Sequence, residues 1–89
     1  METKIALIGI IVYDTESVQR TNALLHEYAE YIVGRMGLPY RARGVNIISV
    51  TLDAPENVIS ALSGKLGQIS GISVKSMIAK EKQKDREKG

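Results

Sequence analysis

The residues of this 89-residue chain that could do chemistry are few and scattered. His26 is the one imidazole, and there is no cysteine. Zinc, nickel and iron sites in small domains draw on several His or Cys ligands, and a serine nucleophile needs a neighbouring base. We assign the carboxylates of Asp14 and Asp53 to helix capping. The sequence therefore predicts no catalytic residue, no metal ligand and no cofactor, and the protein is not expected to be an enzyme.

Six residues remain as candidates for binding. Two arginines at positions 41 and 43 would project from one face of a strand and could hold an anion, although on an edge strand such charges more often prevent edge-to-edge pairing. The segment Ser63–Gly71 places two glycines within a predicted helix, and each costs about 1 kcal/mol relative to alanine. Either these glycines allow close approach to a neighbouring strand or subunit, or the segment contacts a ligand. The candidate binding residues are Arg41, Arg43, Gly64, Lys65, Gly67 and Gln68.

The net positive charge lies at the C-terminal end of the chain. Residues 1–79 contain equal numbers of basic and acidic side chains, so the whole excess of +2 belongs to residues 80–89. Binding to nucleic-acid phosphates requires clustered positive charge, whereas basic and acidic residues alternate here. We expect residues 80–89 to form a solvated, disordered tail, and we do not expect nucleic acid as a partner.

Length and hydropathy favour one domain in the cytoplasm. A chain of 89 residues suits a single hydrophobic core, which we place at residues 1–79. No apolar run approaches the roughly 20 residues that span a bilayer. The apolar stretch Ile5–Val12 lacks the basic start and cleavage site of a secretory signal. We therefore expect a cytoplasmic protein without a membrane partner.

Residues 5–36 predict a strand followed by a helix. Ile5–Val12 is continuously apolar and rich in β-branched side chains, which is typical of a central strand covered on both faces. A helix is expected to begin at Asp14 or Thr15, and glycines at 34 and 37, with a proline at 39, would stop it. Its apolar stripe consists of Val18, Leu25, Tyr28, Ile32 and Met36.

The second half of the chain repeats this pattern. Leu38–Arg43 predicts a short edge strand, and Gly44 would supply the positive φ of the turn into the next strand, Val45–Leu52. Asp53 and Glu56 have capping-box spacing before a second helix that begins at about residue 54. Residues 72–79 alternate as a fourth strand. The apolar stripe of the second helix consists of Val58, Leu62, Leu66 and Ile69.

The order βαββαβ predicts a ferredoxin-like α+β fold, with an antiparallel sheet of strand order 4-1-3-2 and both helices on one face. The other face would expose half of the first strand, beside outward residues of the third and fourth strands. An apolar patch of several hundred Å² is usually removed by association, so we expect a homo-oligomer that packs through sheet faces or edge strands. The outward set of the first strand is either Ile5, Leu7 and Ile11 or Ala6, Ile8, Ile10 and Val12, with Ile47, Ser49, Thr51, Ser73, Lys75 and Met77 beside it.

Three segments resemble a known protein family. Ala61–Val74, with the sequence ALSGKLGQISGISV, together with Ile11–Asp14 and Asn22–Glu27, is similar to iron-only hydrogenase system regulators over residues 5–78. The resemblance implies a ferredoxin-like fold related to ACT domains and to the ligand-binding domain of nickel-responsive repressors. It also implies a regulatory role in an oligomer that senses a small molecule or metal. Where nickel-responsive repressors place His and Cys ligands, this chain has Tyr40, Arg41, Arg43, Ile47 and Ser49.

The expected function is that of a small non-enzymatic regulatory or sensor domain. It would act as a homo-oligomer and bind a small-molecule ligand or a protein partner at a subunit interface. The alternative is a transcriptional regulator that contacts nucleic acid directly. A gel-shift titration separates the two, because a neutral body predicts weak binding that disappears in moderate salt.

Overall fold

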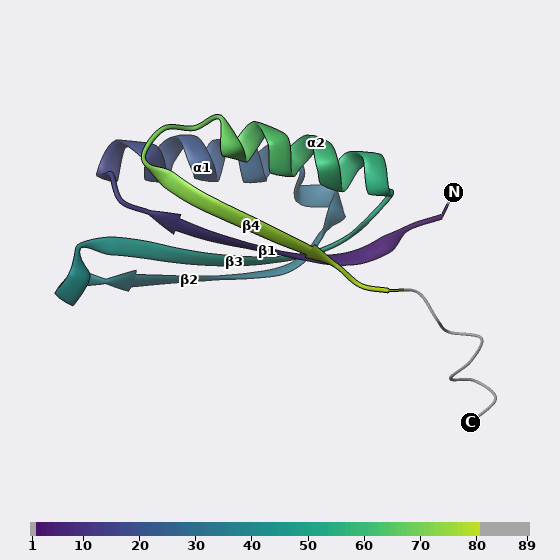
Figure 1. Cartoon of the computed structure of the whole chain (residues 1–89), viewed down its shortest axis with the longest axis horizontal. Coiled ribbons are helices and arrows are strands. Elements are labelled where there is room, and N and C mark those ends of the chain that lie inside the picture. The colour runs from purple at the N-terminus through teal and green to yellow at the C-terminus, as the bar shows by residue number, and fades with distance from the viewer. Residues whose placement is uncertain (1, 81–89) are drawn as a thin grey trace, which may run out of the picture.

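Two helices lie side by side on one face of a four-stranded sheet (Figure 1). The computed structural model describes residues 2–80, and all strand pairs in it are antiparallel with the order β2-β3-β1-β4. This topology confirms the predicted ferredoxin-like βαββαβ fold. The elements are β1 (Lys4–Val12), α1 (Thr15–Glu27), the 3₁₀ turn η1 (Ala29–Tyr31), β2 (Ile32–Tyr40), the 3₁₀ turn η2 (Arg41–Arg43), β3 (Val45–Ala54), α2 (Glu56–Gly67) and β4 (Ile72–Ile78).

The central strand β1 has one buried and one exposed apolar face, as predicted. Its odd-numbered side chains turn away from the helices, and Ile5, Leu7 and Ile11 are 38–42% exposed. Leu7 lies opposite Thr51 of β3 on one side and Met77 of β4 on the other. Because side chains alternate along a strand, the even-numbered set lies beneath the helices. The residues of that set, each at most 1% exposed, are Ala6, Ile8, Ile10 and Val12.

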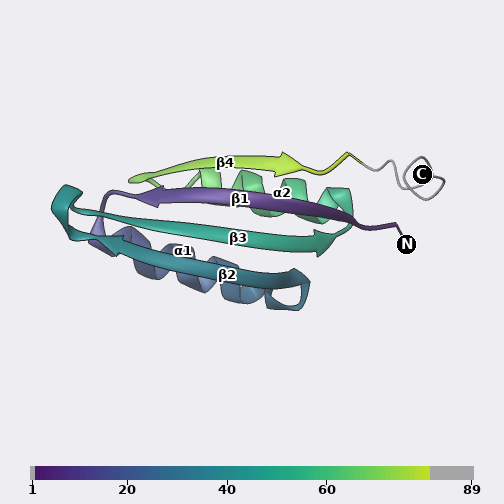
Figure 2. The same cartoon turned by 90° about the horizontal axis from the view of Figure 1, so that it is seen from below.

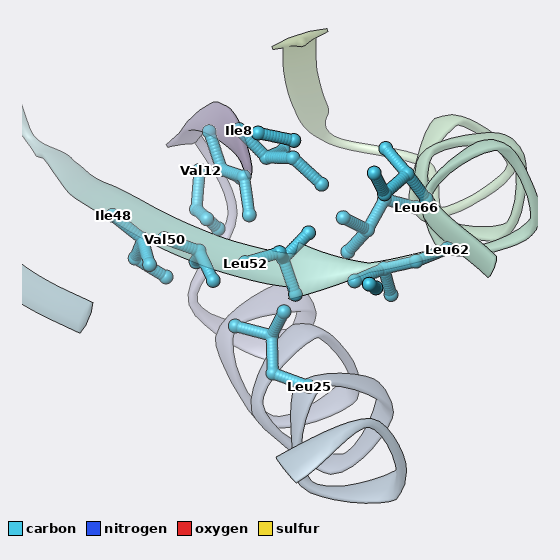
Figure 3. Packing of buried hydrophobic residues seen from close by; sticks show 12 residues of the cluster. Ile8, Val12, Leu25, Ile48, Val50, Leu52, Leu62 and Leu66 are labelled. Atoms are coloured by element: carbon cyan, nitrogen blue, oxygen red, sulfur yellow. The ribbon is translucent and has the colours of Figure 1, made fainter. Parts of the chain in front are cut away.

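The hydrophobic core fills the layer between the sheet and the two helices (Figure 3). Leu25 of α1 points toward Leu52 of β3, and Leu62 and Leu66 of α2 extend toward the sheet beside Ile8. These five side chains are fully buried. Each contributes roughly 1.5–3 kcal/mol through removal of apolar surface from water. Both helices therefore pack their apolar stripes against the same face of the sheet.

Strand β2 begins earlier than the sequence predicted, because α1 ends at Glu27 rather than near residue 36. Ile32 and Met36, assigned to the helical stripe, lie in the strand, where Ile32 pairs with Leu52 and Met36 with Ser49. A β-bulge between Ile32 and Gly34 changes the phase of alternation, so Ile32 faces the core whereas Met36 is 67% exposed. The long β3 needs a hydrogen-bonding partner along its length, and this pairing outweighs the helical spacing.

The predicted second strand was also wrong at its far end. Residues Arg41–Arg43 form the turn η2, so the two arginines do not project together from a strand face. Gly44 closes the turn with a φ of 68°, which confirms the predicted positive φ. The capping box was a further error: Asp53 belongs to β3, and no side chain caps α2. Glu56 instead lies 3.3 Å from the Lys4 ammonium.

The loop before β4 is tied to the turn that begins α1. The Ser17 hydroxyl donates to the Ser70 carbonyl over 2.6 Å, and the Tyr13 N–H donates to the Gly71 carbonyl over 2.8 Å. Gly71 has a φ of 81°, and a Cβ added there would lie 2.9 Å from Asp14 Cβ. The Asp14 carboxylate itself caps α1, as predicted, by accepting the Glu16 N–H. Ser70 and Gly71, at the end of the segment Ser63–Gly71, therefore have a structural role.

Two further expectations concern membranes and the C-terminal tail. Within residues 2–80, no helix has the length and apolar character needed to cross a membrane. The expectation of a disordered tail at residues 80–89 falls, from residue 81 onward, outside the described residues.

Replacing Thr21 with valine should stabilise the fold. Thr21 is fully buried on α1, and its hydroxyl has no hydrogen-bond partner among the described residues. Removing an unsatisfied buried hydroxyl should raise the free energy of unfolding by about 1 kcal/mol, measured by urea denaturation. Thr21→Ser, which keeps the hydroxyl and loses the methyl group, should lower it. If Thr21→Val lowers stability as well, the hydroxyl has a partner in solution.

Candidate functional site

The sheet face opposite the helices is not covered by any element of residues 2–80 (Figure 2). We call this surface the open face. The register places its residues in rows across the strands, and large apolar side chains dominate them. Its members are Ile5, Leu7, Gly9, Ile11, Gly34, Met36, Leu38, Tyr40, Val45, Ile47, Ser49, Thr51, Asp53, Ser73, Lys75 and Met77.

Exposure and charge distinguish this face from an ordinary surface. Met77 is 60% exposed, Met36 67% and Leu38 55%, besides the outward residues of β1. Lys75 and Asp53 are the two charged residues of the open face, and they have opposite signs. The face is thus a mostly apolar, electrically neutral surface, as the sequence predicted for the residues beside β1.

A hollow of about 390 Å³ lies in the middle of the open face, over Gly9. Gly9 pairs with Ser49 on one side and Lys75 on the other, so the row lacks a side chain at its centre. Ile11 and Ile47 form its apolar side. A Cβ added at Gly9 would come no closer than 4.0 Å to the Lys75 carbonyl oxygen. The fold itself therefore does not require a glycine at this position.

A second hollow, of about 440 Å³, lies at the end of the sheet where η2 joins β2 to β3. We call it the tyrosine hollow, because two half-exposed tyrosines line it together with an arginine. The Tyr13 hydroxyl is 3.0 Å from Ser73 Oγ, which fixes the ring on the side of β4. Its lining residues are Ile11, Tyr13, Tyr40, Arg43, Val45 and Ile47.

A third hollow, of about 350 Å³, separates the two helices on the opposite side of the sheet. Lys65 and Gln68 of the GKLGQ segment line it, with Arg20 and Glu27 of α1. The Lys65 ammonium lies 5.3 Å from the centre of the Tyr28 ring. The neighbouring Tyr28 raises the pKa of Lys65 above its ordinary value, so Lys65 is cationic at neutral pH. This lysine already has a contact within its own chain.

The structure thus divides the six predicted binding residues among separate places. Arg43 lines the tyrosine hollow, whereas Arg41, in the same turn, lines none of these hollows. A Cβ at Gly64 or Gly67 would meet no described atom within 4 Å, so close approach to a strand of the same chain is not the reason for either glycine. Lys65 and Gln68 lie in the groove between the helices.

Sequence reasoning did not find the tyrosines. Tyr40 was placed in a strand but given no role beyond packing, and Tyr13 was not assigned to any element. Both lie at strand ends on either side of β3, and this relation follows only from the sheet order. The available signal was the place of Tyr13 directly before the predicted start of the first helix, since binding residues lie disproportionately in loops; Tyr40, inside a predicted strand, gave no such signal.

Comparison with known proteins gives a family and a fold. Residues 4–76 match the family model TM1266-like, described as "Iron-only hydrogenase system regulator, putative". The structure of uncharacterized protein TM1266 from Thermotoga maritima is similar with a TM-score of 0.85 and 39% identity, covering 89% of this chain and all of that one. The C-terminal domain of the MgtC protein from Mycobacterium tuberculosis has a TM-score of 0.69 at 10% identity, covering 86% of this chain and 88% of that one, and shows the fold alone.

Among curated proteins there is no match. The family model covers most of the chain, and the Thermotoga maritima protein is similar in both sequence and structure over its whole length. The family that the GKLGQISG segment suggested is thereby confirmed. This chain belongs to the TM1266-like family of iron-only hydrogenase system regulators.

Proposed function

We propose that this chain is a non-enzymatic regulatory domain that works as a homodimer packed through the open face. The observation on which the proposal rests is the outward half of β1. Ile5, Leu7 and Ile11 are each about two-fifths exposed at the centre of the sheet, where its own helices cannot cover them. A monomeric protein rarely keeps so large a contiguous apolar surface in water.

The area of the open face supports a second copy as its occupant. Four strands about 4.8 Å apart and a nine-residue β1 rising about 3.3 Å per residue give a flat area of roughly 19 by 30 Å. The accessible surface of the side chains standing on this area is larger than the flat area. A stable interface buries about 800 Å² on each partner, so the open face is close to the size required.

The charges of the open face also suit a copy of itself. In a two-fold interface the same patch meets itself, so every charge needs an opposite charge on the same patch. Lys75 on β4 and Asp53 on β3 meet this requirement, because Lys75 of each protomer can face Asp53 of the partner subunit. A face with one sign of charge would repel its copy.

The regulatory part of the proposal is supported by the family and by the residues of the face. Members of the family are described as regulators. The single histidine of the chain lies on α1, on the other side of the sheet, so the open face offers one amine and one carboxylate but no imidazole base. General base catalysis is most often performed by histidine.

Light scattering or sedimentation velocity of the full chain tests the proposal. At micromolar concentration we expect a species of about twice the 9.7 kDa chain mass, dissociating only on dilution. Because apolar contacts dominate, moderate salt should not dissociate it. A monodisperse species of 9.7 kDa at that concentration would contradict the proposal.

A further inference from the structure

We propose that the tyrosine hollow binds a small planar aromatic anion, held between Tyr13 and Tyr40 with Arg43 as its counter-charge. This inference goes beyond the proposed self-association. Because Ile11, Tyr40 and Ile47 belong both to the hollow and to the open face, a bound ligand and a second copy would compete for them. It is drawn from the level of the two tyrosines in the sheet, the apolar residues that line the hollow with them, and Arg43, which has no carboxylate partner within residues 2–80.

The spacing of the tyrosines follows from the sheet order. Tyr40 of β2 pairs with Val45 of β3, and Tyr13 follows directly after β1, whose last residue, Val12, pairs with Asn46. The two tyrosines therefore stand at the same level on either side of β3, two strand spacings or about 9.6 Å apart. This distance separates the two backbones, and the Tyr13 hydroxyl contacts Ser73 on the side away from Tyr40. Stacked aromatic rings have centroids about 4.5–7 Å apart, so a flat ligand of one or two fused rings in the hollow can contact the tyrosines that line it.

The surface between the tyrosines is apolar. Ile11, Val45 and Ile47 line the hollow below the rings. The volume of about 440 Å³ lies within the range of roughly 300–1,000 Å³ that is usual for small-molecule sites. An aromatic body of one or two fused rings fits within such a space.

The charge at the margin selects an anion. Arg43 lines the hollow, and the one ion pair within residues 2–80 joins Lys4 to Glu56, so Arg43 has no carboxylate partner in this part of the chain. A guanidinium binds a planar carboxylate through two parallel hydrogen bonds. No acidic side chain lines the hollow. An aromatic carboxylate therefore matches both the rings and the charge.

An NMR titration of the full ¹⁵N-labelled chain with 2-naphthoate tests this inference. We expect a dissociation constant on the order of 0.1 mM, because the hollow is open to solvent. The largest amide shifts should map to residues around Tyr13, Tyr40 and Val45. 2-Naphthalenemethanol, which has the same rings without the charge, should bind the wild-type protein about 10-fold more weakly.

Two arginines of one turn provide a matched pair of variants. Arg43→Gln should weaken 2-naphthoate binding about 10-fold or more, whereas Arg41→Gln, with the same loss of charge two residues away, should leave affinity within about two-fold. Tyr40→Leu should weaken binding of both probes, since it removes a stacking partner. The amide spectra of all variants establish that they are folded.

Three outcomes would overturn the inference. These are no measurable binding by either the wild-type protein or the Leu7→Lys variant, equal losses for Arg41→Gln and Arg43→Gln, or shifts that map instead to Lys65 and Gln68 in the groove between the helices. Leu7 does not line the hollow, and a lysine at the centre of the open face should prevent the proposed self-association, which is followed by mass. If the Leu7→Lys chain does not bind 2-naphthoate either, the ligand proposal fails whatever the outcome for the dimer.

Discussion

Replacing Gly71 with alanine should lower the free energy of unfolding by about 3 kcal/mol. The residue has a φ of 81°, a conformation that costs a residue with a Cβ about 1–2 kcal/mol. The new Cβ would also lie 2.9 Å from Asp14 Cβ and 3.0 Å from Ser17 Oγ, so the start of α1 must shift. That shift would strain the 2.6 Å hydrogen bond from Ser17 to the Ser70 carbonyl. Overpacking of this kind costs about 1–3 kcal/mol more.

The same segment supplies the control for Gly71. Gly64 lies inside α2, and a Cβ there meets no described atom within 4 Å. Gly64→Ala should therefore raise the free energy of unfolding by about 0.5–1 kcal/mol through helix propensity alone. Urea denaturation at one fixed protein concentration compares the two, because association would also affect stability. An unchanged Gly71→Ala midpoint would contradict the required backbone conformation; a destabilised Gly64→Ala would indicate a close contact at the helix surface, as between subunits.

The fold could be predicted wherever one physical effect determined the pattern. Ile5–Val12 is apolar at successive positions, which indicates a central strand, and β1 lies inside the sheet with its even-numbered side chains buried beneath the helices. The helix α2 ends at Gly67, and Gly71, directly before β4, has the positive φ that favours glycine. These features depend on the local sequence and on which side chains are buried, and both can be inferred from the residue types.

Strand β2 could not be predicted in the same way, because its boundary depends on tertiary pairing. Tyr28, Ile32 and Met36 are spaced by four, which suits one face of a helix. The strand forms because β3 offers backbone groups along its whole length, and a bulge at Ile32 and Gly34 then lets Met36 face outward. Neither effect is visible in residues 28–36 alone.

The candidate sites likewise include one that could be predicted from the sequence and one that could not. The outward neighbours of β1, including Ile47 and Met77, followed from alternation once the sheet order was known. The tyrosine hollow did not, because Tyr13 and Tyr40 are distant in sequence and line the same hollow only because β1 and β2 lie on the two sides of β3. Arg43 was singled out for its charge, but its separation from Arg41 is a property of the turn η2. Pairing across strands supplies information that spacing along the chain lacks.

Replacing Leu7 with lysine should dissociate the proposed dimer. Leu7 lies at the centre of the open face, between Thr51 and Met77, and is 42% exposed in the single chain. In a two-fold interface the substitution occurs on both protomers, so two unpaired ammonium groups would lose water on association. We expect the dissociation constant to rise by about 100-fold or more, corresponding to about 3 kcal/mol. Sedimentation equilibrium over a concentration series measures this change.

The matched control is Ala61→Lys, which adds the same charge at an exposed position of α2, on the covered side of the sheet. It should leave the dissociation constant unchanged, because α2 lies away from the open face. Leu7→Lys should also leave the folded single chain intact, since its lysine can extend into water. If Leu7→Lys remains dimeric, association occurs elsewhere, and the unpaired edges of β2 and β4 become the next surfaces to test. If Leu7→Lys is monomeric and Ala61→Lys still dimerises, the interface includes the outward half of β1, where the apolar surface lies.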